Sequence, residues 1–79
     1  MERHSTLDVR DMLCAQALAQ AGQAMRHVES GGTLEILCNA AEVKNDLVAW
    51  AAHTGHRVIS LDDDGEDQRL RIEKSDRRS

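Results

Sequence analysis

The sequence contains no proline, and Trp50 is the single aromatic residue among its 79 residues. One aromatic side chain cannot form the stacking surface on which proteins bind single-stranded nucleic acid. Positive charge is also scarce, because 10 lysines and arginines face 14 aspartates and glutamates and give a net charge of -4. Proteins that bind nucleic acid neutralise phosphates with lysine and arginine. We therefore expect no direct binding of nucleic acid.

Long hydrophobic segments are missing as well. The longest uninterrupted apolar run is 47–52, whereas a membrane-spanning helix needs about 20 residues. The first residues, 1–4, lead into polar sequence without the apolar segment of a secretory signal. We expect no membrane association and a cytoplasmic location. In that reducing compartment the two cysteines, Cys14 and Cys38, are expected to be free thiols.

The remaining composition suits one small folded domain. Apolar residues make up 41% of the chain, which is more than disordered sequences contain. The length permits one domain over 1–79 with one aliphatic core. Residues 74–79 are charged and have nothing to bury, so we expect them to form a disordered tail.

Hydrophobic periodicity predicts four strands and two helices. Alternating or β-branched apolar residues predict strands over 6–10, with Leu7 and Val9 inward, and over 33–38, 56–61 and 68–73. Apolar residues at helical spacing predict a helix from Cys14 that ends at 30–32, and a second helix around 43–54 that ends at Gly55. Asn39 is expected to begin a turn or cap the second helix, and 62–65 to form a hairpin turn.

The order β-α-β-α-β-β predicts an α/β (α+β) two-layer sandwich. Both helices should cover one face of a mixed four-stranded sheet. The first β-α-β unit should make its two strands parallel, and parallel strands end at the same edge of a sheet. Cys14 follows the first strand and Cys38 ends the second, so we expect both cysteines at this edge.

Cys14 is the main candidate for a chemical role. At a helix N-terminus, unpaired N–H groups and the helix dipole stabilise a thiolate, which can accept and pass on a sulfane sulfur as a persulfide. The alternative is a small buried hydrophobic side chain. For Cys38 the alternatives are a thiol that resolves a Cys14 persulfide or forms a regulatory disulfide, and a buried strand cysteine.

Several segments together resemble one family. These are the stretch 6–14, the residues 32–34, Asp46, the residues 54–56 and the closing stretch 71–74. They are similar to the TusA/SirA sulfur-carrier family. The resemblance implies the β-α-β-α-β-β fold, no cofactor, and a persulfide on Cys14. It also implies a cysteine desulfurase as donor and a downstream acceptor protein, in tRNA thiolation, molybdenum-cofactor enzymes or sulfur metabolism.

The sequence departs from the family's motif, which is Asp, Gly three residues on, then Cys-Pro-x-Pro. Asp8 and Cys14 match this motif, whereas Asp11 replaces the glycine. Both motif prolines are replaced, and further family prolines or their neighbours are replaced at three later positions: Ala15, Ala17, Ala40, Ala41 and Val48. Proline fixes φ in the first turn of a helix, so alanine there gives up rigidity around the thiol.

Charges near Cys14 bear on its reactivity. Asp11 is expected to raise the pKa of the thiol, and Arg10 could support the thiolate. Two hypotheses follow: a sulfur carrier acting through Cys14, or a non-catalytic protein-interaction or regulatory module of the same fold that has lost carrier chemistry. The degraded motif favours the second as Cys14 favours the first.

Other polar clusters carry weaker signals. His53 and His56 have a spacing that a metal could use within a helix, but Gly55 interrupts it, so we predict no metal site. Basic residues near the C-terminus could dock an acidic partner or, as the alternative, protect an edge strand. Trp50 is expected to anchor the core.

Overall fold

The computed structural model describes residues 2–75. Its elements follow the predicted order β-α-β-α-β-β, which is confirmed: β1 (Glu2–Asp8), α1 (Cys14–Arg26), β2 (Val28–Cys38), α2 (Ala41–Thr54), β3 (Arg57–Asp63) and β4 (Gln68–Glu73). From residue 76 onward, the predicted tail lies outside the described residues. The first two residues of that predicted tail, Lys74 and Ser75, are described and are held by hydrogen bonds. Lys74 N donates to Gly32 O at 2.8 Å, and Ser75 N donates to His56 Nδ1 at 3.1 Å.

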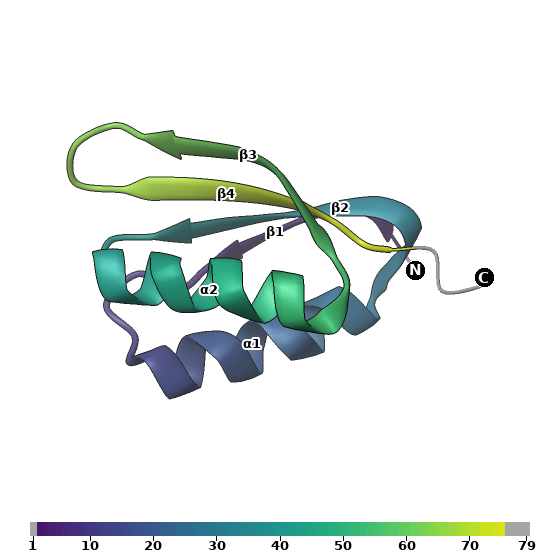
Figure 1. The fold of residues 1–79 in the computed structure, drawn as a ribbon, viewed down its shortest axis with the longest axis horizontal. Helices are drawn as coiled ribbons and strands as arrows, with labels where there is room; N and C mark the ends of the chain where they lie inside the picture. The colour runs from purple at the N-terminus through teal and green to yellow at the C-terminus, as the bar shows by residue number, and fades with distance from the viewer. Residues whose placement is uncertain (1, 76–79) are drawn as a thin grey trace.

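The four strands form one mixed sheet, as predicted. Their order is β1-β2-β4-β3, with β1 parallel to β2 and the two other neighbouring pairs antiparallel. Both helices lie against the same face of this sheet (Figure 1). α1 contacts β1 and β2, and α2 contacts β3 and β4. Over residues 2–75, no helix combines the length and hydropathy needed to cross a bilayer.

The core between the two layers is aliphatic. The inward residues of the two central strands meet the apolar stripes of both helices, and Trp50 packs against them from a half-buried position. Alanines at the centre of the stripes allow the helices to approach the sheet closely. The buried hydrophobic residues are Val9, Ala17, Ala21, Met25, Val28, Leu34, Ile36, Cys38, Val43, Leu47, Ala51, Leu70 and Ile72.

The start of the second strand differs from the prediction. α1 ends at Arg26, and β2 begins at Val28, so the glycine segment 30–32 lies inside the strand rather than ending the helix. β1 pairs with β2 irregularly there, because Glu2 faces Val28 but His4 faces Thr33. β2 thus has three more residues than β1 over this stretch, which is an irregularity of the bulge type. A Cβ on Gly32 would lie 2.5 Å from the Arg3 carbonyl oxygen, so this glycine permits a close backbone approach.

Two other boundaries were predicted wrongly. β1 ends at Asp8, and Val9 is buried in the following loop, where its N–H donates to Leu37 O at 2.8 Å. β3 continues to Asp63, so the hairpin turn begins two residues later than predicted. Asp64 N donates across this turn to Asp67 O at 3.1 Å. Gly55 ends α2 in the left-handed conformation, at φ 86°, as predicted.

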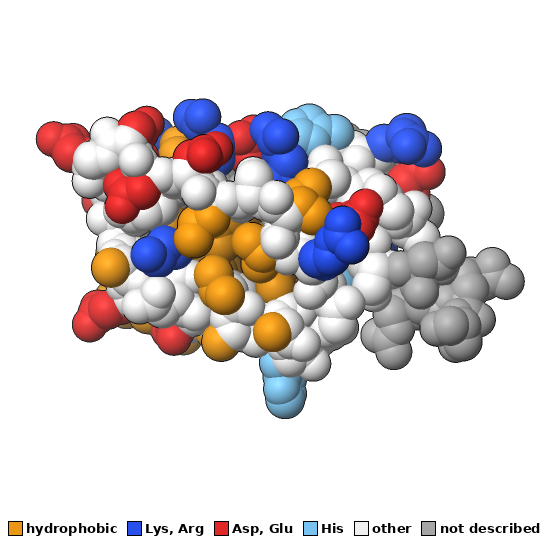
Figure 2. All heavy atoms as spheres, turned by 45° about the horizontal axis from the view of Figure 1, so that its top comes forward, with side chains coloured by type: hydrophobic (Ala, Val, Ile, Leu, Met, Phe, Trp, Pro, Cys, Tyr) orange, Lys and Arg blue, Asp and Glu red, His pale blue; other side chains and the backbone are white. Residues whose placement is uncertain are grey.

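Hydrophobic side chains also reach the surface. Three large ones are exposed among the described residues: Leu13, Ile59 and Leu61. Figure 2 shows hydrophobic side chains gathered between the β3 edge of the sheet and α2, with lysine or arginine side chains on either side.

Candidate functional site

Cys14 is the first residue of α1 and is half-buried. The loop 9–13 leads into it from β1. Leu13 precedes the helix with extended backbone angles, and its N–H donates to Gln16 Oε1 at 3.1 Å. The first helical turn is closed by Ala17 N donating to Leu13 O at 2.9 Å. The thiol therefore sits at a helix start beside Leu13, a residue that is 73% exposed.

Carboxylates on α2 govern the protonation of Cys14. Side-chain hydrogen bonding to Asp46 raises the pKa of the thiol, and partial burial and the negative charges of Asp46 and Glu42 raise the pKa further. A pKa rise was predicted from Asp11, but the carboxylates responsible lie on α2. The helix dipole at the start of α1 does not outweigh them. The net effect of these groups is to disfavour the thiolate form of Cys14.

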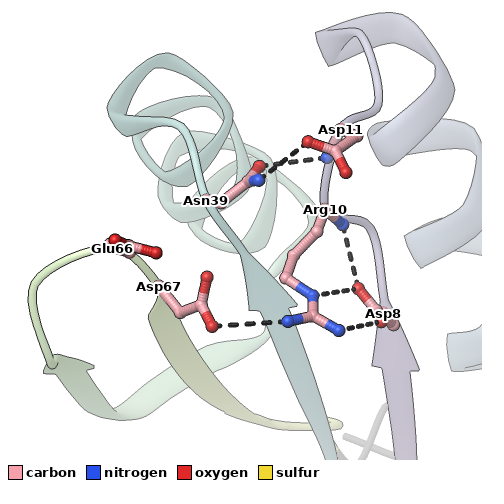
Figure 3. A pocket seen from close by; sticks show the side chains of 6 residues that line it. All are labelled: Asp8, Arg10, Asp11, Asn39, Glu66 and Asp67. Carbon is pink, nitrogen blue, oxygen red and sulfur yellow. Dashed lines mark hydrogen bonds and ion pairs between the residues drawn. The ribbon is translucent and has the colours of Figure 1, made fainter.

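Arg10 joins the loop to two strand ends. Its Nε and Nη2 donate to Asp8 Oδ1 and Oδ2 at 3.0 and 2.9 Å, and its Nη1 donates to Asp67 Oδ2 at 3.4 Å (Figure 3). Hydrogen bonds from the Arg10 side chain, and then from its backbone N–H, lower the pKa of Asp8. The guanidinium thus bridges Asp8 at the end of β1 and Asp67 in the hairpin, and support of the Cys14 thiolate by Arg10 stays a prediction.

Asp11 has left-handed backbone geometry, with φ 64°. Aspartate and asparagine tolerate this region better than other residues with a Cβ. Asn39 secures it from the end of β2, because Asp11 N donates to Asn39 Oδ1 at 3.0 Å and Asn39 Nδ2 donates to Asp11 Oδ1 at 2.9 Å. Asn39 was expected to begin a turn or cap α2. The N-cap is instead Ala40, which makes no side-chain cap bond, and Asn39 pairs with the loop before α1.

These loop residues border an open polar hollow of about 410 Å³. Four carboxylates and a single guanidinium give its lining an acidic character. Figure 3 shows the side chains that line it: Asp8, Arg10, Asp11, Asn39, Glu66 and Asp67. Among the described residues, no group of histidine, cysteine and acidic side chains is arranged to hold a metal ion. The hollow presents hydrogen-bond acceptors and negative charge beside the loop that precedes Cys14.

Cys38 ends β2 in the core. It is fully buried, its Sγ lies 3.9 Å from Gln68 Oε1, and burial raises the pKa of its thiol. Both Cys14 and Cys38 are free thiols. Complete burial supports the interpretation of Cys38 as a core residue, since a resolving thiol needs access to the sulfur that it attacks.

A less polar surface lies along the seam between the two helices. One hollow there is lined by Leu18, Asp46, Ala49, Trp50 and His53. Asp46 therefore faces both the Cys14 thiol and this hollow. Farther along the seam, the Trp50 ring lies 5.7 Å from the His56 ring, with the two planes tilted by 52°.

Comparison with known proteins identifies the family. The family model described as Sulfurtransferase TusA matches residues 5–74. The chain belongs to the TusA family. One relative, named Putative sulfur carrier protein YrkI, from Bacillus subtilis (strain 168), is 31% identical over 94% of this chain and 99% of its own length. Another from the same organism, Putative sulfur carrier protein YrkF, is 29% identical over 84% of this chain but only 36% of its own length.

Membership of the TusA family accounts for the left-handed backbone at Asp11. Asp11 occupies the position of the motif glycine, and its positive φ is the conformation that glycine adopts freely. The sequence comparison identified the position but not the Asn39 partner that holds it. The Cys14–Asp46 pairing was also missed. Asp46 was recognised as a family match, but its spacing in the sequence carried no sign that α2 would place it against α1.

Proposed function

We propose that this TusA family member is a sulfur carrier in which Cys14 holds sulfane sulfur as a persulfide. The observation that carries the proposal is the position of this thiol. Cys14 is free, partly accessible and the first residue of α1, in the part of the chain that matches the family model. The names of the two relatives as sulfur carriers support the same role.

The transfer itself requires no oxidant. The Cys14 thiolate attacks the outer sulfur of a persulfide on the donor enzyme, so that a new S–S bond forms at Cys14 Sγ. The S–S bond of the donor breaks, and the donor cysteine leaves as a thiolate that takes up the proton lost by Cys14. An acceptor protein then attacks the same outer sulfur and regenerates the Cys14 thiol.

Asp46 and Glu42 connect this chemistry to partner binding. Their carboxylates raise the pKa of Cys14 and hold the free carrier in its less reactive thiol form. A donor that brings positive charge against α2 would neutralise these carboxylates and increase the thiolate fraction. In this proposal, the carrier becomes reactive when it docks.

The proposed donor is a cysteine desulfurase, and the proposed acceptor is a downstream sulfur-transfer protein. The sulfur would be used in tRNA thiolation, molybdenum-cofactor enzymes or sulfur metabolism. We place the exchange in the cytoplasm, where reducing conditions keep Cys14 available as a thiol. Contact with nucleic acid is assigned to the acceptor rather than to this acidic chain.

Persulfide formation tests the proposal directly. The protein is incubated with a cysteine desulfurase and cysteine, and its intact mass is measured before and after reduction. We expect wild type and the control Cys38→Ala to gain one reducible sulfur atom, and Cys14→Ser to gain none. Failure of folded wild type to gain sulfur from several desulfurases would overturn the proposal, and equal loading of Cys14→Ser would assign the sulfur to Cys38.

The raised pKa of Cys14 favours a second candidate function, a protein-interaction or regulatory module without carrier chemistry. Such a module would bind a desulfurase or an acceptor through its surface alone. Binding by wild type and Cys14→Ser with equal affinity, together with no sulfur gain by wild type, would select this candidate.

A further inference from the structure

β3 forms one edge of the sheet and presents unusual hydrophobic exposure. Two of the three exposed large hydrophobic residues in the described chain are on this strand: Ile59 is 39% exposed and Leu61 is 47% exposed. Val48 of α2 and Val58 of β3 are partly buried against the core. The gathered hydrophobic side chains in Figure 2 lie over this part of the molecule. An edge strand with apolar side chains is a template for pairing with another strand.

The charges of β3 are arranged for pairing with itself. The strand begins with Arg57, whose side chain is 77% exposed, and ends with the exposed residues Asp62 and Asp63. Antiparallel association of two copies places the start of each strand against the end of the other. Positive charge then meets negative charge at both ends of the pair. β1, the other edge, has no exposed large hydrophobic side chain among the described residues.

A bulge in β3 determines which residues of this strand share a face of the sheet, and therefore which register pairs complementary side chains on both faces. Pairing with β4 is irregular between Val58 and Ser60, so Ile59 is the additional residue. Because of this bulge, Arg57 and Asp62 share the outer face, opposite Glu73 and Arg69 of β4, respectively.

The inner face of β3 carries apolar residues at the complementary positions. Val58 and Leu61 lie opposite Ile72 and Leu70, which are both buried in the core. Pairing Arg57 with Asp62 of a second copy therefore also pairs Val58 with Leu61 of that copy. Without the bulge, the alternation of side chains would put Arg57 and Asp62 on opposite faces.

We propose that β3 is a homodimer interface, in which two copies pair antiparallel across a two-fold axis near Ile59 and Ser60. The interface is isologous, since the same residues contribute from each copy. It joins two four-stranded sheets into one continuous sheet. α1 packs against β1 and β2, away from this edge, so both Cys14 thiols remain open to partners.

Sedimentation over a wide concentration range, with reductant present to prevent disulfides through Cys14, tests the proposal. Wild type is expected to dimerise reversibly. Arg57→Glu and Asp62→Arg each create two like-charge contacts and should raise the dimer dissociation constant by at least about tenfold. Arg26→Glu is the matched control, because it reverses an exposed arginine on α1 and should leave the dimer unchanged.

Mixing distinguishes a charge effect from damage to the fold. An equimolar mixture of Arg57→Glu and Asp62→Arg restores opposite charges at both contacts and should dimerise, as should the double variant carrying both changes. Circular dichroism checks that each chain is folded. A wild type that stays monomeric up to millimolar concentration, or single variants that dimerise as wild type does, would overturn the proposal. A mixture of folded single variants that stays monomeric would equally do so.

Discussion

The backbone at Asp11 provides a quantitative test of the loop that leads to Cys14. A residue with a Cβ in the left-handed region costs about 1–2 kcal/mol relative to the right-handed region, and aspartate reduces this cost through local hydrogen bonds. Asp11→Ala keeps the positive φ and removes the bond from Asn39 Nδ2 at 2.9 Å. An exposed bond of this kind contributes about 0.5–1 kcal/mol. Together we expect Asp11→Ala to lower the free energy of unfolding by about 1–2 kcal/mol.

Two further substitutions separate backbone strain from the hydrogen bond. Asp11→Gly relieves the backbone strain of the positive φ, but it loses the hydrogen bond to Asn39. Glycine also increases the entropy of the unfolded chain, and this entropy term costs about 0.5–1 kcal/mol of stability. These terms nearly offset one another, so we expect a net loss of about 0–1 kcal/mol. Asp11→Asn keeps both the conformational tolerance and a side chain able to bond to Asn39, and should match wild type.

Urea unfolding, followed by Trp50 fluorescence and circular dichroism, measures this series. The expected order of stability is wild type and Asp11→Asn first, then Asp11→Gly, then Asp11→Ala. For a chain of this size, 1 kcal/mol corresponds to about 4–8 °C in Tm, so thermal unfolding resolves the same order. If Asp11→Ala were as stable as Asp11→Gly, the assignment of backbone strain to this position would be refuted.

Three other perturbations test separate parts of the structure. Asp46→Asn should lower the pKa of Cys14 and accelerate its alkylation near neutral pH, and an unchanged pH–rate profile would contradict the carboxylate assignment. Gly32→Ala should cost about 1–3 kcal/mol in urea unfolding, because its Cβ would meet the backbone of β1, and wild-type stability would exclude this close approach. Arg10→Met should restore the pKa of Asp8 towards its usual value. The pKa of Asp8 is depressed in folded wild type. The extra stability of wild type over Arg10→Met is therefore fully present above the unfolded-state pKa of Asp8, and it declines as pH falls through the folded-state pKa. A stability difference that stays constant across acid pH would contradict this role of Arg10.

Local patterns in the sequence predicted most of the fold. The alternation of apolar and polar residues in β4, and their helical spacing in α2, each place one face in the core and the other towards solvent. Gly55 ends α2 with a positive φ that glycine adopts without strain. The same logic failed at 30–32. Glycines there were assigned to a helix end, but their positions are set by the approach of β1, which lies far away in sequence.

The candidate site was predictable only in part. Cys14 was found because its motif and its place before a helix are local properties of the sequence. The contacts that control its surroundings are not local: Asp46 arrives from α2, Asn39 holds Asp11 from the end of β2, and Asp67 reaches Arg10 from the hairpin. Each contact depends on the packing of elements rather than on spacing within one of them.

The solitary tryptophan makes the helix seam optically distinct. Trp50 lines the hollow that it shares with Leu18 and Asp46, and also a second hollow bordered by Met25 of α1 and Thr54 of α2. The chain has no tyrosine or phenylalanine. Intrinsic emission therefore reports on this seam without contributions from other aromatic side chains. A partner that binds along α1 and α2 will change the Trp50 emission spectrum. Association of two copies through the outer edge of β3 is followed instead by the increase in molecular mass seen in sedimentation. A single unlabelled sample thus distinguishes binding at the two surfaces.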